Sequence, residues 1–400
     1  MLNNLKISLF LANRSIAKGN KGTLILTIFI MALVFINLLL ISSILLGIID
    51  LTDNQVINTL YGNIVIEPRK DEKYINDVQS LKQKINNVPG VTGVSAHYVV
   101  GAELSYKNKS GAWSVRSIIP ADEMTVTTTH NFMVDGEYLS KQDTDEIMLG
   151  KEIPGGYGGD LEYLSLGGVK VGDRIDVRFN NGVKRIYRVK GVFDVSFEQS
   201  DSTAYLSQRE MESVLGLEDR ASHILIKTAG KGNEDQYIKQ FLELGIKEDI
   251  KSWRVYAGFV KSLTQSFSII NTLFAGIGLF VASVTIFIII YVSTISKRRH
   301  IGILRAIGIK ESIVIQSYIF QAMFFAISGI IFGFLILFLV LKPYFIAHPL
   351  KFPTGLVSLS ITSESISVNA VSIIITALIS GLIPSWLSVH ATILEAIWGD

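Results

Sequence analysis

Four long runs without a charged residue constrain this chain more than any other feature. They cover residues 22–49, 262–296, 312–341 and 368–389. A helix needs about 20 mainly apolar residues to cross a bilayer, and each run is long enough to do so. The sequence therefore predicts four membrane-spanning helices.

The composition agrees with a membrane protein that also has a sizeable aqueous part. The mean hydropathy is +0.40, and only 18% of the 400 residues are charged. There is no cysteine, which excludes disulfides and thiolate chemistry.

Basic residues predict the orientation of the spans. Lys6, Arg14, Lys18 and Lys21 precede the first run, and a second basic group lies within residues 297–310. Because short loops rich in Lys and Arg stay on the cytoplasmic side, we expect both termini inside and residues 50–261 outside.

These signals divide the chain into nine segments. We expect an interfacial amphipathic helix over residues 1–21, with Leu2, Leu5, Leu9, Ala12 and Ile16 on one face. The first span has no signal-peptide cleavage site and is expected to stay as an anchor. The other expected segments are an outside domain at 50–261, a second span with an outer stalk at 262–296, a cytoplasmic coupling helix at 297–311, a third span at 312–341, an irregular outer loop at 342–367, a fourth span at 368–389 with a kink at Pro384, and a cytoplasmic tail at 390–400.

The domain between the first two spans is expected to mix helices and strands. Its two ends predict strand–helix–strand units, so we expect an α/β base with a β-rich insertion at about 121–220. The expected elements are a strand at 62–68, a helix carrying Ile75, Val78, Leu81 and Ile85, two or three strands at 91–119, a hairpin of 169–177 with 183–192, a helix capped by Ser207 and ended by Gly216, a strand at 223–227, and a helix at 234–244 with Ile238, Phe241 and Leu242 inward. The predicted fold class is a four-helix membrane protein with a large α+β extracytoplasmic domain.

The segment between the second and third runs is the candidate functional element. Its apolar residues recur at helical spacing, which predicts a short docking helix with Leu304 and Ile307 on one face. Arg305 projects elsewhere and could meet a protein carboxylate or a lipid phosphate. A loop that only sets the topology is the alternative. The candidate residues for contact with a partner are Arg298, Arg299, Ile301, Gly302, Ile303, Leu304, Arg305, Ala306, Ile307 and Gly308.

Two glycines in the third run are candidates for helix packing. Gly329 and Gly333 form a small-xxx-small pattern, which allows another helix to approach closely. Incidental glycines are the alternative interpretation.

Known catalytic motifs are missing from the sequence. It contains no phosphate-binding Gly-x-x-x-x-Gly-Lys-Ser/Thr loop, no His-Glu-x-x-His motif and no Gly-x-Ser-x-Gly elbow. We therefore predict no catalytic residue, no cofactor, no metal and no nucleic-acid partner, and we expect any ATP to be hydrolysed by another subunit.

Two sets of motifs resemble a known family. The pattern Arg-x-x-Ile-Gly-x-Leu-Arg-Ala-x-Gly at 298–308 resembles the cytoplasmic signature of FtsX/MacB-type permeases of ABC transporters, with His300 where those proteins usually carry an acid. The segments at 147–152, 171–175 and 188–193 are similar to the outer domain of the lipoprotein-releasing (Lol) and MacB-like permeases.

The resemblance implies a non-catalytic permease of the bacterial inner membrane. It would pair with a second copy or a paralogue, bind a dimer of cytoplasmic ABC ATPases and contact membrane lipids. A periplasmic adaptor or a lipoprotein is a further partner that the resemblance allows. ATP-driven motion would pass across the membrane to the outer domain, for lipoprotein release or for export from the periplasm or outer leaflet. An FtsX-like regulator of an extracytoplasmic partner, such as a cell-wall hydrolase, is the alternative.

Overall fold

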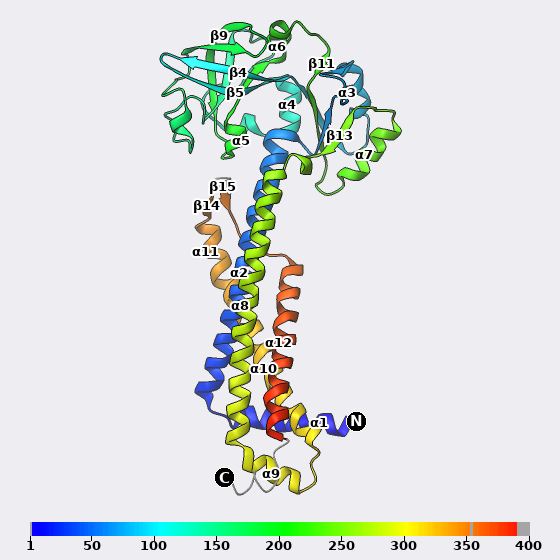
Figure 1. The fold of residues 1–400 in the computed structure, drawn as a ribbon, viewed down its shortest axis with the longest axis vertical. Helices are drawn as coiled ribbons and strands as arrows, with labels where there is room; N and C mark the ends of the chain where they lie inside the picture. Colours follow the sequence, from blue (N-terminus) through cyan, green and yellow to red (C-terminus); the bar gives the residue numbers. More distant parts are fainter. Residues whose placement is uncertain (1, 353–354, 390–400) are drawn as a thin grey trace. The chain divides into compact units, whose positions relative to one another are not determined.

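The computed structural model describes residues 2–352 and 355–389 of the chain (Figure 1). It divides into two compact units. We call the first the membrane unit (Met1–Ile48, Leu263–Leu350 and Val357–Asp400) and the second the inserted domain (Ile49–Ser262 with Lys351–Leu356). The predicted tail at 390–400 lies outside the described residues.

Four helices are long and apolar enough to cross a membrane, as the uncharged runs predict. They are α2 (Lys21–Gln55), α8 (Gly258–Ser296), α10 (Glu311–Ile336) and α12 (Ser363–Val389). Pro384 lies inside α12.

Several helices extend beyond the uncharged runs. The helix α2 continues past Ile49, and a π-helical segment, η1 (Val56–Tyr61), follows it directly. The helix α12 begins before Val368. Charged and polar residues can continue a helix, so hydropathy marks the apolar part of each helix and misses its ends.

The predicted irregular loop at 342–367 is partly wrong. The third span continues through η5 (Leu337–Leu341) into α11 (Lys342–Ala347), with Pro343 in the first turn of α11, where a helix tolerates proline. Two short strands, β14 (Leu350–Phe352) and β15 (Gly355–Val357), then pair with each other.

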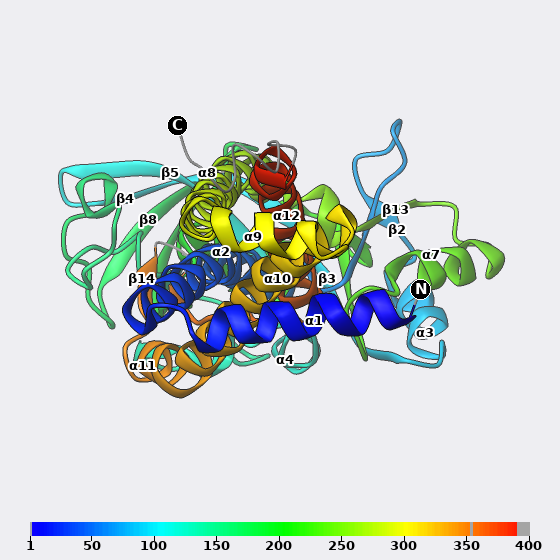
Figure 2. The same cartoon turned by 90° about the horizontal axis from the view of Figure 1, so that it is seen from below.

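The N-terminal helix α1 (Leu2–Ala17) lies across the lower ends of the membrane helices and packs against α10 (Figures 1 and 2). Ser8 and Ala12 are buried in this contact, whereas Leu5 and Leu9 are exposed. Only part of the predicted apolar face therefore packs against α10, and the rest points outward. The side chain of Leu2 lies outside the described residues.

The two glycines of α10 lie against α2. A Cβ atom added to Gly329 would lie 2.4 Å from Cβ of Met31, and one added to Gly333 would lie 2.9 Å from the carbonyl oxygen of Ala32. Only glycine leaves room for α2 and α10 to approach this closely.

The first sheet of the inserted domain combines strands from both ends of the domain. Its strand order is β13-β1-β12-β3, and each neighbouring pair is antiparallel. The members are β1 (Ile64–Glu67), β3 (Val91–His97), β12 (His223–Thr228) and β13 (Asp249–Ser252), with helices α3 (Val78–Asn86) and α7 (Glu234–Glu243) nearby (Figure 1). The predicted α/β base built from both ends is confirmed.

The second sheet has the order β6-β9-β7-β10-β5-β4-β8, and β8 also pairs with β9, so six of its strands close into a ring. Its strands are β4 (Val99–Tyr106), β5 (Lys109–Ile118), β6 (Met133–Gly136), β7 (Glu146–Gly150), β8 (Arg174–Phe179), β9 (Lys184–Phe193) and β10 (Thr203–Ser207). The remaining elements of the domain are β2 (Ile75–Asn76), β11 (Arg220–Ala221), α4 (Pro120–Val126), α5 (Glu198–Asp201), α6 (Gln208–Leu215) and the short 3-10 helices η2 (Thr129–Asn131), η3 (Glu162–Leu164) and η4 (Trp253–Val255).

Some local predictions for this domain are confirmed and others are corrected. The β8–β9 hairpin forms, and the Ser207 side chain caps α6 by accepting from the Glu210 amide. The β-rich part also includes β4 and β5, so it begins well before residue 121. Ile75 lies in β2, and Leu242 is exposed.

Candidate functional sites

The predicted docking segment forms the helix α9 (Arg298–Ala306), which turns directly into α10. The turn contains Gly308 at a φ of 94°, a left-handed conformation that favours glycine. The amide of Gly308 donates to the carbonyl of Arg305, 3.0 Å away. This tight turn fixes α9 to the end of a membrane helix.

The faces of α9 differ from the predicted arrangement. Ile301 and Gly302 are buried, and Ile301 packs into the same core as Val314 of α10. Ile303 and Ile307 are 47% and 71% exposed. The outward apolar pair is thus Ile303 with Ile307. The periodicity alone could not show which face packs onto α10.

Leu304 does not share the exposure of Ile307. It is half-buried and lines a hollow whose other walls include residues of α1 and α10, so it faces its own chain. The predicted face that joined Leu304 to Ile307 is therefore wrong.

The basic residues of α9 have different surroundings. Arg305 makes an ion pair with Glu311 in the first turn of α10. Arg299 and Ala306 are exposed, and Arg298 is partly exposed. The ion pair gives Arg305 a structural role within the chain and further fixes α9 to α10.

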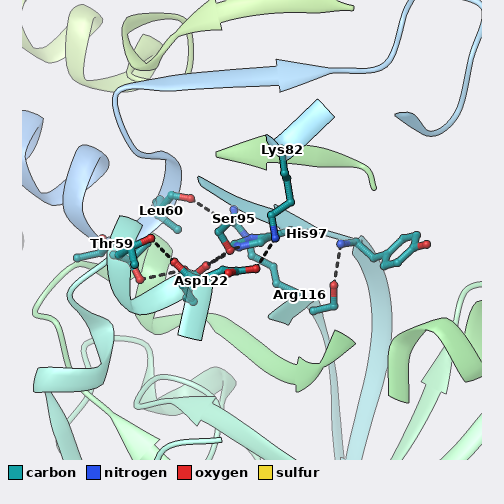
Figure 3. Close-up of polar contacts among 12 residues, drawn as sticks. Thr59, Leu60, Lys82, Ser95, His97, Arg116 and Asp122 are labelled. Carbon is teal, nitrogen blue, oxygen red and sulfur yellow. Dashed lines mark hydrogen bonds and ion pairs between the residues drawn. The ribbon is translucent and has the colours of Figure 1, made fainter. Parts of the chain in front are cut away.

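A second candidate site surrounds η1, the segment in which α2 ends (Figure 3). Arg116 of β5 donates to the carbonyl of Leu60 at 2.9 Å, and the amide of Thr128 donates to the carbonyl of Asn58 at 2.8 Å. The last carbonyls of a helix lack partners within the helix, so these donors complete its hydrogen bonding. The end of α2 is therefore fixed to the second sheet, a feature with no signal in the sequence.

Next to η1 lies a buried polar cluster that includes Ser95 and His97 (Figure 3). Its centre is Glu123 of α4. Its carboxylate accepts hydrogen bonds from Ser95 at 2.7 Å and Thr127 at 2.9 Å, and it lies 2.6 Å from Nε2 of His97. Burial by itself raises the pKa of Glu123, but the adjacent His97 imidazole and these hydrogen bonds outweigh it and lower that pKa to about 2. The carboxylate is thus held ionised inside the domain.

Serine, histidine and glutamate are the residue types of a hydrolase triad, but their arrangement here excludes that role. Ser95 and His97 both contact the same oxygen of Glu123, and all three side chains are buried. A nucleophile must be reachable by substrate, and its base must in turn be oriented by the acid. The cluster is structural: it joins β3 to α4.

Sequence comparison identifies the family. A family model described as "MacB-like periplasmic core domain" matches residues 24–244, and one described as "FtsX-like permease C-terminal" matches residues 272–393. The fold defines a membrane protein with a large α/β domain between its first and second spans. The chain belongs to the FtsX/MacB-type permeases of ABC transporters. The predicted family and fold class are confirmed.

Individual proteins resemble the chain more distantly. It is 23% identical over 325 residues to the uncharacterized ABC transporter permease MJ1507 of Methanocaldococcus jannaschii, covering 79% of this chain and 78% of that protein. The periplasmic region of MacB from Actinobacillus actinomycetemcomitans is 16% identical, covers 52% of this chain and 95% of that structure, and has a TM-score of 0.37. The extracellular domain of the noncanonic ABC-type transporter YknZ from Gram-positive bacteria is also 16% identical, covers 48% of this chain and 97% of that structure, and has a TM-score of 0.35. Because both scores are below 0.5, the family assignment rests on the sequence matches. Membership of this family implies an ATPase partner and a permease dimer.

Proposed function

We propose that this permease carries ATP-driven motion of a separate ATPase across the membrane to the inserted domain. The motion would serve lipoprotein release or export of a substrate from the periplasm or outer leaflet. In this proposal both termini and α9 are cytoplasmic, and the inserted domain is extracytoplasmic. The basic residues that flank the first span and fill α9 support this orientation.

The observation that carries the proposal is the structure of α9. Its outer face exposes Ile303 and Ile307, while Ile301 and the Arg305–Glu311 ion pair hold its inner side against its own chain. A small apolar surface on a rigidly held helix suits insertion into a groove of a partner. A push on α9 would be passed to α10, because the turn between them is short.

Two continuous helices offer a route to the inserted domain. The helix α2 runs from Lys21 to Gln55 without a break, and α8 runs from Gly258 to Ser296. At its far end α2 passes into η1, whose carbonyls are held by Arg116 and Thr128. A displacement of α2 along its axis would therefore be transmitted to β5 and the second sheet.

Photo-crosslinking tests the contact with the ATPase. We expect p-benzoylphenylalanine at Ile303 or Ile307 to capture the co-expressed ATPase subunit in the assembled transporter. The same probe at Ile346, which is 65% exposed at the opposite end of the third span, should capture none. If the ATPase co-purifies but neither α9 position crosslinks to it, α9 is not the contact.

A further inference from the structure

The helices α1, α9 and α10 lie close together at one end of the membrane unit (Figure 2). Two adjoining hollows are lined there by residues of α1, α9, α10 and the end of α8. One measures about 490 Å³ and the other about 240 Å³. Ser15, Lys18, Lys297 and Gln321 line both, so the two hollows share a wall. Together they form a partly enclosed groove at the basic end of the membrane unit, which we call the α1–α9 groove.

The charged side chains that line the α1–α9 groove are all positive. Its lining includes Arg14, Lys18 and Lys297, and no carboxylate among the described residues. The described part of the chain also gives Arg14, Lys18 and Lys297 no ion-pair partner within 4.0 Å. The groove therefore has the charge complementary to an anion.

Lys297 is held in the groove by hydrogen bonds that link α1 and α10. Its ammonium donates to the hydroxyl of Ser15 on α1, and that hydroxyl donates to the amide oxygen of Gln321 at 3.1 Å. Burial lowers the pKa of Lys297, with no nearby carboxylate to offset the loss of solvation. An anion in the groove would supply the missing counter-charge.

Apolar side chains of the membrane helices form much of the remaining lining, beside the hydroxyls of Thr23, Ser293 and Ser296. They include Leu24 of α2, Ile289 of α8 and Phe325 of α10. A cationic, hydrogen-bonding end followed by an apolar wall matches an amphiphile with an anionic head and an acyl chain. A soluble anion would match only the first part.

We propose that the α1–α9 groove binds one anionic phospholipid of the cytoplasmic leaflet, with its headgroup phosphate against Lys297, Arg14 and Lys18. The leaflet named here rests on the orientation in the proposed function, but binding itself does not depend on contact with an ATPase. A lipid held between α1 and α9 would link the docking helix to the membrane surface. The positive-inside bias alone predicts only diffuse attraction of lipids to exposed charges.

Lipid titration of the purified full chain, followed by native mass spectrometry, tests the site. We expect dioleoylphosphatidylglycerol to bind about tenfold or more tightly than dioleoylphosphatidylcholine, since each basic residue near the headgroup adds about 1 kcal/mol. Lys297→Gln should remove most of this preference. So should Arg14→Gln with Lys18→Gln, which changes only exposed side chains and should leave folding intact.

The matched control is Lys21→Gln with Lys310→Gln. It removes two exposed charges from the same end of the membrane unit but outside the groove, and it should leave the preference unchanged. If the control variant and the groove variants reduce the preference for the anionic lipid equally, the attraction is diffuse and the proposal is overturned. Displacement of the bound lipid by inorganic phosphate at millimolar concentration would also overturn it, because it would indicate a site for soluble anions. Failure of the crosslinks at Ile303 and Ile307 would leave these outcomes unaffected.

Discussion

Replacement of Ile307 by aspartate is expected to separate the permease from its ATPase without disturbing the fold of the chain. Ile307 is 71% exposed, so the substitution removes no packing within the chain. Burying one such side chain in a partner contributes about 1.5–3 kcal/mol, or roughly 10- to 100-fold in the dissociation constant. A carboxylate placed in an apolar contact adds a further cost. Substrate-dependent ATP turnover by the reconstituted complex, together with retention of the ATPase in detergent, measures the effect.

Lys310→Asp is the control for this prediction. It introduces a negative charge at an exposed position three residues along the chain, where the lysine is the N-cap of α10. An acidic residue is compatible with an N-cap, so folding should be retained. We expect this variant to keep most of its coupled turnover. If Ile307→Asp behaves like Lys310→Asp, α9 only sets the topology. Leu304→Asp could not decide the question, because Leu304 also packs within its own chain.

Glu123→Ala is expected to destabilise the inserted domain by about 3–5 kcal/mol, because each buried donor left without its acceptor costs about 1–3 kcal/mol. The substitution leaves His97, Ser95 and Thr127 without their shared acceptor. Hydrogen exchange of the β3 and α4 amides in the full chain would measure the loss. Because the folded-state pKa of Glu123 is below its unfolded value, this contribution is present above about pH 4.3 and is lost as the pH falls towards 2.

Two further variants distinguish the buried pair from surface electrostatics. Glu103→Ala breaks an exposed contact with Arg178, 3.7 Å away, and should cost about 1 kcal/mol or less. His97→Leu combined with Glu123→Leu should recover much of the stability lost in Glu123→Ala, because the buried imidazole without an acceptor is then replaced by an apolar side chain. A double variant as unstable as Glu123→Ala would show that the unpartnered His97 is not the source of the loss.

Local sequence signals predicted much of this structure. Long uncharged runs gave the four spans, Ser207 and Gly216 marked both ends of α6, and Asn180–Gly182 marked the turn of the β8–β9 hairpin. These features depend on residues close together in the chain. The Gly329–Gly333 pattern predicted a close helix approach, although only the structure identifies α2 as the partner.

Features that depend on distant residues could not be predicted. The packing of α9 on α10 decides which of its faces points outward. The spacing of apolar residues in the sequence is compatible with either face, so it could not predict this. The parallel pairing of β5 with β10 joins strands that lie far apart in the sequence. Local signals do not show this pairing, so the predicted β-rich insertion begins at residue 121 and leaves out β4 and β5. The buried cluster joins His97 to Glu123, and a hydrogen bond from Arg116 to the carbonyl of Leu60 holds η1. None of these four residues belongs to a local sequence motif that would predict its partner.

The most direct test of the central claim is whether ATP bound by the partner moves the inserted domains of the permease dimer. The chain has no cysteine, so in a dimer of two copies a spin label at a cysteine replacing the exposed Lys184 would report a single distance between the two subunits. We expect ATP with a hydrolysis-deficient ATPase to shift that distance distribution, measured by double electron–electron resonance in nanodiscs. The shift should be absent in Ile307→Asp. An unchanged distribution in the unsubstituted permease, with the ATPase bound and loaded with ATP, would contradict the account.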